Sequence, residues 1–234
     1  LINIPFGLIA IALSAVFIQK DDRQFERRSF DFLGAGVFIF GLVALLYGLN
    51  QGHALGWGSF QILIILFAAA VSLIVFLIIE KRSFSPMLDL HLFSNSIFST
   101  SVVSAIFNYI GVYTITFLMP FYLIQGRGYS VAEAGLILTV MPLTMAFIAP
   151  IMGIISDRIG TRFPAFFGMT ILTFGQLLLT KVGPYNSIQD LSMRLVISGF
   201  GIGTFISPNN SALMGSAPKD RQGIAAGMLA TSRN

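Results

Sequence analysis

Residues 60–79 read FQILIILFAAAVSLIVFLII, a run that contains two strongly polar residues, Gln61 and Ser72, and no charge. A helix of this length rises about 30 Å, which matches the hydrocarbon thickness of a bilayer of about 30 Å. Helices of soluble proteins instead carry a polar face toward water. The run therefore predicts a helix that crosses a membrane.

The same pattern recurs on both sides of this run. Further apolar stretches lie at 1–18, 33–50, 98–123, 131–155, 163–181 and 192–215, and an eighth stretch begins near Gly223. The chain is 55% hydrophobic and only 10% charged, whereas soluble domains average about 25% charged residues. We predict an all-α, polytopic transmembrane bundle. Since the first stretch starts abruptly at Leu1 and the last stops at Asn234, we expect a truncated bundle of seven complete or nearly complete helices and part of an eighth.

Basic residues divide unevenly between the connections. Two lie in one set, Arg127 and Lys181, and ten lie in the alternate set: Lys20, Arg23, Arg27, Arg28, Lys81, Arg82, Arg158, Arg162, Lys219 and Arg221. The positive-inside rule assigns the larger set to the cytoplasm. The net charge of +4 thus reflects topology, and no nucleic-acid partner is predicted. The chain lacks cysteine and its two histidines fall on opposite predicted sides, so we predict no metal site and no cofactor.

One connection carries an ordered motif. Residues 153–162 read GIISDRIGTR, the pattern G-x-x-x-D-R-x-G-x-R, with its fixed positions at Gly153, Asp157, Arg158, Gly160 and Arg162. The glycines permit close helix approach and a tight reversal. Asp157 can accept backbone N–H groups or pair with a guanidinium. The motif is interpreted either as a cytoplasmic latch used in gating or as a basic turn that only fixes topology.

This motif resembles the loop signature of the major facilitator superfamily. More narrowly, the chain resembles the fourteen-helix drug:proton antiporters of the EmrB/QacA type. The residues that carry the narrower resemblance are Asn3-Ile4-Pro5-Phe6-Gly7, Phe30-Asp31-Phe32-Leu33-Gly34, Gly56-Trp57, Glu80, Pro86-Met87-Leu88-Asp89-Leu90, Leu92-Phe93, Arg194, Gly199, Gly201 and Gly203.

The resemblance implies a domain plan. Residues 1–18 would be the last helix of an N-terminal bundle, residues 19–95 a cytoplasmic linker and an inserted helix pair, and residues 96–234 a truncated C-terminal bundle. It also implies proton-coupled efflux of lipophilic or cationic small molecules by a multi-pass protein that is embedded in the lipid bilayer of the cell membrane. No carboxylate occupies the middle of a predicted helix, so proton coupling is implied by the resemblance alone.

Several polar residues within the predicted helices are candidates for the substrate path: Asn108, Tyr109, Tyr113, Arg194 and Asn209. Polar and aromatic side chains in an apolar helix can line a cavity, but they can equally make interhelical hydrogen bonds. Arg194 has three interpretations, which are a transport role, an ion pair with Asp190 or Glu133, and extension toward the outer interface.

The function predicted from the sequence is secondary active transport by alternating access. A transporter of a hydrophilic metabolite is an alternative within the same class, and a signalling or scaffold membrane protein is an alternative from another class. An enzyme is not predicted, because no cluster of His, Asp or Glu stands at one predicted membrane face.

Overall fold

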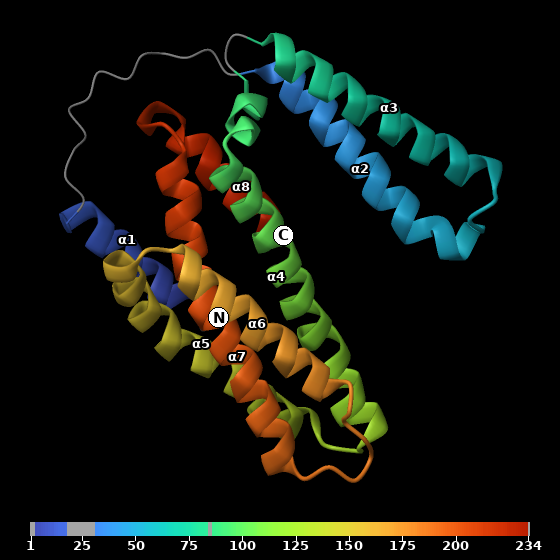
Figure 1. Cartoon of the computed structure of the whole chain (residues 1–234). Coiled ribbons are helices and arrows are strands. Elements are labelled where there is room, and N and C mark those ends of the chain that lie inside the picture. The colour runs from blue at the N-terminus through green and yellow to red at the C-terminus, as the bar shows by residue number, and fades with distance from the viewer. Residues whose placement is uncertain (1–2, 18–30, 84–85, 234) are drawn as a thin grey trace.

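The computed structural model describes residues 3–17, 31–83 and 86–233, and these ranges contain helices and no strand (Figure 1). The α-helices are α1 (Asn3–Phe17), α2 (Phe32–Leu55), α3 (Phe60–Arg82), α4 (Ser96–Phe121), α5 (Val131–Ile159), α6 (Arg162–Leu179), α7 (Ile188–Ser216) and α8 (Gln222–Arg233). Three short helices join them: η1 (Leu90–Ser94), the π-helical η2 (Tyr122–Gly126) and η3 (Lys219–Arg221). The predicted linker at 19–30 falls outside the described residues.

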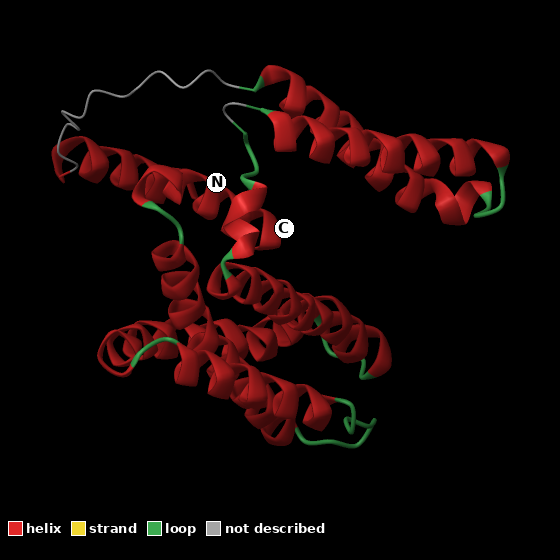
Figure 2. Ribbon diagram, turned by 45° about the horizontal axis from the view of Figure 1, so that its top comes forward, coloured by secondary structure: helices red, strands yellow, loops and turns green. Residues whose placement is uncertain are grey.

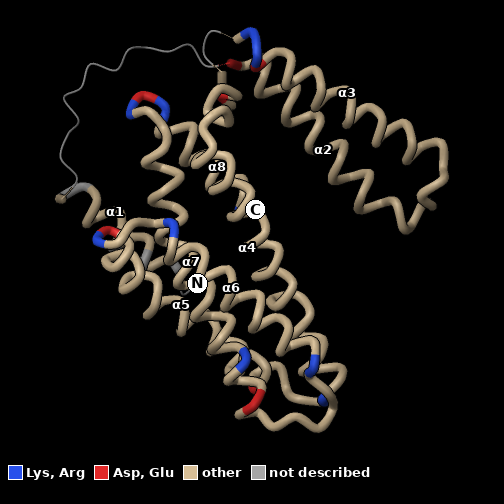
Figure 3. Tube along the Cα trace, viewed as in Figure 1, with Lys and Arg blue, Asp and Glu red and all other residues tan. Residues whose placement is uncertain are grey.

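Six of these helices, α2 to α7, are long and apolar enough to cross a membrane. Large apolar side chains on their outer surfaces are exposed, including Phe67 and Phe147, as expected where lipid and not water is the solvent. Charged residues gather at the helix ends (Figure 3). The prediction of an all-α transmembrane bundle is confirmed.

Local sequence signals set the helix ends. Ser130 and Glu133 form a reciprocal capping box at the start of α5, which satisfies N–H groups that have no intrahelical partner. At the other end of α5, Gly160 adopts a φ of 88°, a conformation that favours glycine. The Gly160 N–H donates to the Ser156 carbonyl at 2.9 Å, so the chain reverses directly into α6.

Helix α7 is the centre of the bundle and packs on both α5 and α6 (Figure 1). A side chain at Gly201 would collide with the backbone of Leu172, and one at Gly168 would lie 2.5 Å from the Phe205 nitrogen. On the opposite face, a side chain at Gly199 would lie 2.5 Å from the Met141 carbonyl oxygen. The glycines thus permit helix backbones to touch, as small residues do in membrane bundles.

Helices α2 and α3 form a hairpin that stands beside the bundle (Figure 2). The Ser72 hydroxyl on α3 donates to the Val37 carbonyl on α2 at 2.8 Å. At the C-terminal end of α3, the buried Glu80 accepts the N–H groups of Met87 and Leu88 at 3.2 Å each. An ion pair of 2.7 Å between Asp89 and Arg221 then connects this segment to the α7–α8 connection.

We predict that Gly201→Ala destabilises the bundle, because the new methyl group would meet the backbone of α6, which cannot rotate away. Overpacking of this kind costs about 1–3 kcal/mol. The measurement is thermal unfolding of the purified full-length protein in detergent. Gly215→Ala is the matched control, since nothing lies within 4 Å of the added carbon on the same helix and alanine favours helix. Equal melting temperatures for the two variants would contradict the close contact.

Candidate functional site

The motif at 153–162 joins α5 to α6 as predicted. A side chain at Gly153 would lie 2.8 Å from the Ser207 hydroxyl on α7, so the first glycine of the motif permits a close approach. Asp157, Arg158 and Arg162 are exposed. Within the described ranges, their side chains make no ion pair or hydrogen bond. The structure therefore explains why glycine stands at position 153, whereas the role of Asp157 in a latch remains a prediction.

A cavity of about 1170 Å³ lies between α4, α6 and the end of α7. Arg162 lines it at the start of α6, and the hydroxyls of Thr100, Ser101 and Ser104 line it along α4. Asn209 contributes from α7 and is fixed there, because its amide donates to the Ser101 carbonyl at 3.1 Å. The cavity thus has a polar wall at the end of the bundle that we predict to be cytoplasmic.

Asn108 lies one helical turn deeper than Ser104 and is fully buried. Its amide nitrogen contacts the Met169 sulfur at 3.7 Å, and its side-chain oxygen has no partner. The amide nitrogen of Gln176 and the hydroxyl of Thr204 are also buried without a partner. Burying a polar atom without a hydrogen-bond partner costs free energy. These three side chains therefore have donors or acceptors that could bind a polar group of a ligand or a water molecule.

Tyr109 and Tyr113 face a different space. They line a cavity of about 550 Å³ between α4 and α8, together with Phe117 and Arg233. The Tyr113 hydroxyl donates to the Arg233 carbonyl at 2.8 Å. The predicted path residues on α4 are therefore divided between two sides of the helix, with Asn108 on one and the tyrosines on the other.

Arg233 is not among the path residues predicted from the sequence. The sequence shows it only as a basic residue within the apolar stretch that begins near Gly223. In the structure it lies in α8, the helix that begins at Gln222, and its side chain is exposed.

A third cavity is almost entirely apolar. It has a volume of about 310 Å³ between α4, α5 and α7, and Met141 and Met145 line it beside Pro142 and Leu195. Methionine side chains are flexible and polarisable, so they adapt to ligands of different shape.

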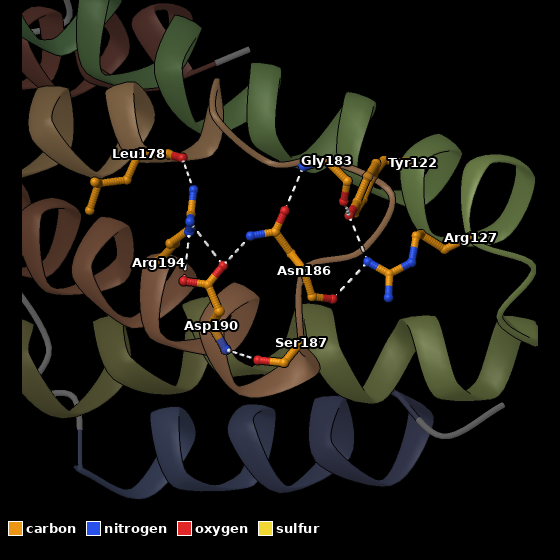
Figure 4. A network of polar contacts seen from close by, with 8 residues as sticks. All are labelled: Tyr122, Arg127, Leu178, Gly183, Asn186, Ser187, Asp190 and Arg194. Carbon is orange, nitrogen blue, oxygen red and sulfur yellow. Dashed lines mark hydrogen bonds and ion pairs between the residues drawn. The ribbon is translucent and has the colours of Figure 1, made fainter.

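Arg194 is anchored near the predicted outer end of α7 (Figure 4). Its guanidinium pairs with Asp190 at 2.9 Å and donates to the Leu178 carbonyl on α6. Asp190 also accepts from the Asn186 amide at 2.6 Å. The arrangement matches one of the three interpretations of Arg194, the ion pair with Asp190.

The same network reaches α4 through Asn186 (Figure 4). The Asn186 side-chain oxygen accepts the Gly183 N–H at 2.6 Å, and the backbone carbonyl of Asn186 accepts from Arg127 at 2.8 Å. Arg127 also donates to the Tyr122 hydroxyl at 3.0 Å, and Tyr122 donates to the Gly183 carbonyl at 2.7 Å. The bond to Tyr122 raises the pKa of the Arg127 guanidinium, which stays charged. The network ties together the outer ends of α4, α6 and α7.

A helical bundle with six helices that are long and apolar enough to cross a membrane is the architecture of a multi-pass membrane protein. Residues 1–234 match the family model described as Major Facilitator Superfamily. The chain belongs to the Major Facilitator Superfamily.

Several curated relatives are similar over nearly the whole chain. The riboflavin transporter RibZ of Clostridioides difficile is 35% identical over 240 residues, which cover 100% of this chain and 50% of the relative. The multidrug resistance protein Stp of Mycobacterium tuberculosis is 29% identical over 232 residues, with coverages of 99% and 43%. The multidrug transporter protein MdtP of Bacillus subtilis is 30% identical over 224 residues, with coverages of 95% and 41%. The chain spans about half the length of the curated relatives it matches.

We predict that Asp190 and Arg194 are energetically coupled. Because Asp190 is more than one-third exposed and Arg194 is mostly buried, solvent screening keeps the coupling small but favourable. A double-mutant cycle of Asp190→Asn and Arg194→Gln, read out by unfolding of the full-length protein in detergent, measures this value. Asp190→Asn combined with Arg158→Gln at the opposite end of the bundle is the control and should be additive. Additive effects in both cycles would show that the ion pair does not stabilise the protein.

Proposed function

We propose that this chain is part of a secondary active transporter that exports small amphipathic compounds by alternating access. Membership of the Major Facilitator Superfamily over residues 1–234 carries this proposal. The cavities between α4, α5, α6, α7 and α8 support it, because a moving substrate needs space between helices that can rock against one another.

Efflux is favoured by the names of the relatives, since Stp and MdtP are described as multidrug proteins. The methionine-lined cavity between α4, α5 and α7 also favours it, because an adaptable apolar wall suits compounds of varied shape. The similarity to a riboflavin transporter favours the second candidate, a transporter dedicated to one metabolite. Both candidates use the same fold and differ in the breadth of substrates.

The finer plan is also a proposal. Residues 1–18 would complete an N-terminal bundle, residues 19–95 would hold the linker and an inserted helix pair, and residues 96–234 would begin the C-terminal bundle. The hairpin of α2 and α3 supports the inserted pair of a fourteen-helix transporter, since it packs mainly on itself. Protons as the coupling ion and the cell membrane as the location follow from the same comparison with drug:proton antiporters.

We further propose that Asp157 acts in a latch at the cytoplasmic side. The short α5–α6 reversal is held by Gly160 at positive φ, so Asp157 has a defined position at the helix end. Asp157 has no partner within the described part of the chain and is exposed. It is therefore free to bond in another state of the cycle, where charge-assisted hydrogen bonds are worth about 1.5–3 kcal/mol each.

Export by the full-length protein is the direct test. We expect cells that lack their own efflux pumps to accumulate less ethidium, and less of a neutral dye, when they express the protein. We also expect a protonophore to abolish the difference, because a collapsed proton gradient removes the driving force. Cells expressing the protein without its substrate-lining bundle, residues 96–234, are the control. Accumulation equal to that control for every compound tested, riboflavin included, would contradict the proposed export.

For the latch, we predict that Asp157→Asn inserts normally but turns over more slowly, because loss of the charge shifts the balance between states. A cysteine introduced at Asn108 should become more reactive to a cytoplasmic thiol reagent in this variant. Residues 1–234 contain no cysteine, so this part of the protein adds no other reactive thiol. Parental transport rates together with unchanged labelling would leave the motif as a topological turn.

A further inference from the structure

We propose that residues 86–95, the segment between the α2–α3 hairpin and α4, fasten the hairpin to the bundle of α4 to α8. The hairpin then keeps a fixed position relative to that bundle in every state of the transport cycle. Glu80 is the positioning residue at the hairpin end, and the Asp89–Arg221 ion pair makes the connection at the bundle end. This inference rests on the proposed transport function and names the moving body to which the hairpin belongs.

Glu80 lies in the last turn of α3, and only 3% of its surface is exposed. Its two carboxylate oxygens accept the N–H groups of Met87 and Leu88, one each, at 3.2 Å. Within the described ranges, no basic side chain forms an ion pair with Glu80. A buried carboxylate without a cation depends on its hydrogen bonds. Helix α3 and the backbone at 87–88 therefore hold each other in place.

The two N–H groups explain why a carboxylate stands at position 80. Met87 and Leu88 precede η1 and have no helical partner for these groups, so each needs an acceptor from elsewhere. A glutamine of the same length offers one acceptor oxygen, and its NH2 group would face the second N–H. Glutamine would therefore keep the volume of the side chain and lose one of the two bonds.

Asp89 continues the connection from this segment to η3. One of its carboxylate oxygens accepts the His91 N–H at 3.0 Å and caps η1, and the other pairs with Arg221 at 2.7 Å. Only 17% of the Asp89 side chain and 28% of the Arg221 side chain are exposed, so water screens this pair less than a pair on the surface. Because Asp89 directly follows Leu88, which is bound to Glu80, two consecutive residues join α3 to η3.

The rest of the segment is anchored to the bundle. Leu92 is buried in one apolar cluster with Phe98 of α4 and Leu213 of α7. The Asn95 amide donates to the carbonyl of Ser216, the last residue of α7, at 3.2 Å. The segment thus contacts both ends of the path from α4 to α7, and it cannot move away from the bundle without breaking these contacts.

Two other arrangements are a hairpin that moves with α1 and a hairpin that moves alone. In Figure 1 the hairpin stands beside the bundle, and the green segment that precedes α4 lies between them. A hairpin held only by its connecting chain would be free to swing. The hydrogen bonds at Glu80 and the ion pair at Asp89 remove this freedom, so they favour a hairpin that is fixed to the bundle of α4 to α8.

Distances between spin labels on the full-length protein in lipid nanodiscs test the proposal. The labels are attached to cysteines introduced at exposed positions, which are Leu8 on α1, Ala54 on the hairpin and Leu177 on α6, after any cysteine outside residues 1–234 has been replaced. Pulsed electron paramagnetic resonance is recorded in mildly acidic and mildly alkaline buffer, with and without ethidium. We expect a narrow Ala54–Leu177 distance distribution with the same mean in every condition. A broad distribution, or a mean that shifts with the condition, would overturn the proposal.

Variants test the residues that we name, with the width of the Ala54–Leu177 distribution as the readout. Glu80→Gln and Asp89→Asn should each broaden it about twofold, because each removes a charge-assisted bond. Since asparagine can still cap η1, a broadening in Asp89→Asn reports the ion pair. Arg221→Lys keeps the charge and should broaden the distribution less than Arg221→Gln.

The matched control is Arg82→Gln, which removes an exposed charge from the end of α3 and should leave the width unchanged. Unchanged widths in Glu80→Gln, Asp89→Asn and Arg221→Gln would overturn the proposal. Lower melting temperatures with unchanged widths would also overturn it, because they would show a role in stability alone. If these variants fail to fold, the parental distribution decides the question by itself.

The proposed transport function and the fastening fail in different ways. Leu8 lies on the helix that we assign to the N-terminal bundle, so the Leu8–Leu177 distance reports the movement of the two bundles. If this distance is constant and cells export nothing, the transport function is wrong, and the width of the Ala54–Leu177 distribution still decides the fastening. If both distances change with the condition, the transport function stands and the fastening is wrong.

Discussion

The direct contact between the backbones of α6 and α7 is the constraint from which the rest of the bundle follows. Lipid removes the hydrophobic driving force between membrane helices, so packing at close range must replace it. Gly168 and Gly201 allow that range by placing no side chain between the helices. Gly199 allows α5 to approach the other face of α7 equally closely. Helix α7 is therefore packed between α5 and α6 at the centre of the bundle. The cavities then form where α4 and α8 meet this dense core through larger side chains.

The two ends of the bundle are held in different ways. At the predicted outer end, a chain of polar contacts runs from Arg194 through Asn186 to Arg127. These contacts connect α7, the α6–α7 connection and the segment that follows α4, so we expect these parts to move together. At the other end, the charged side chains at Asp157 and Arg162 are exposed, and Arg162 lines a large cavity that has one polar wall. The α5–α6 turn is therefore less tied to its neighbours than the opposite end of the bundle, although the Asp89–Arg221 ion pair links η1 to the α7–α8 connection at the same end.

The sequence predicted the helices well because each apolar run is a direct consequence of the solvent. Helices α5 and α6 begin within one residue of the predicted stretches at 131–155 and 163–181. The sequence could not predict which neighbour each face meets. Asn108 and Tyr109 are adjacent in the chain but point to separate cavities, since consecutive helical residues are turned by about 100°. The sequence left three interpretations of Arg194 open, because its partner can be identified only from the positions of Asp190 and of the Leu178 carbonyl in the folded protein.

The hairpin of α2 and α3 has a consequence for how such proteins evolve. Its two helices pack on each other through the Ser72–Val37 hydrogen bond and through close contacts at glycines such as Gly41. The chain on either side of it, at Asp31 and Pro86, lines one shared cavity. An ancestral gene could therefore gain or lose this segment as a unit, because the joined ends are neighbours and the bundle would not need to repack.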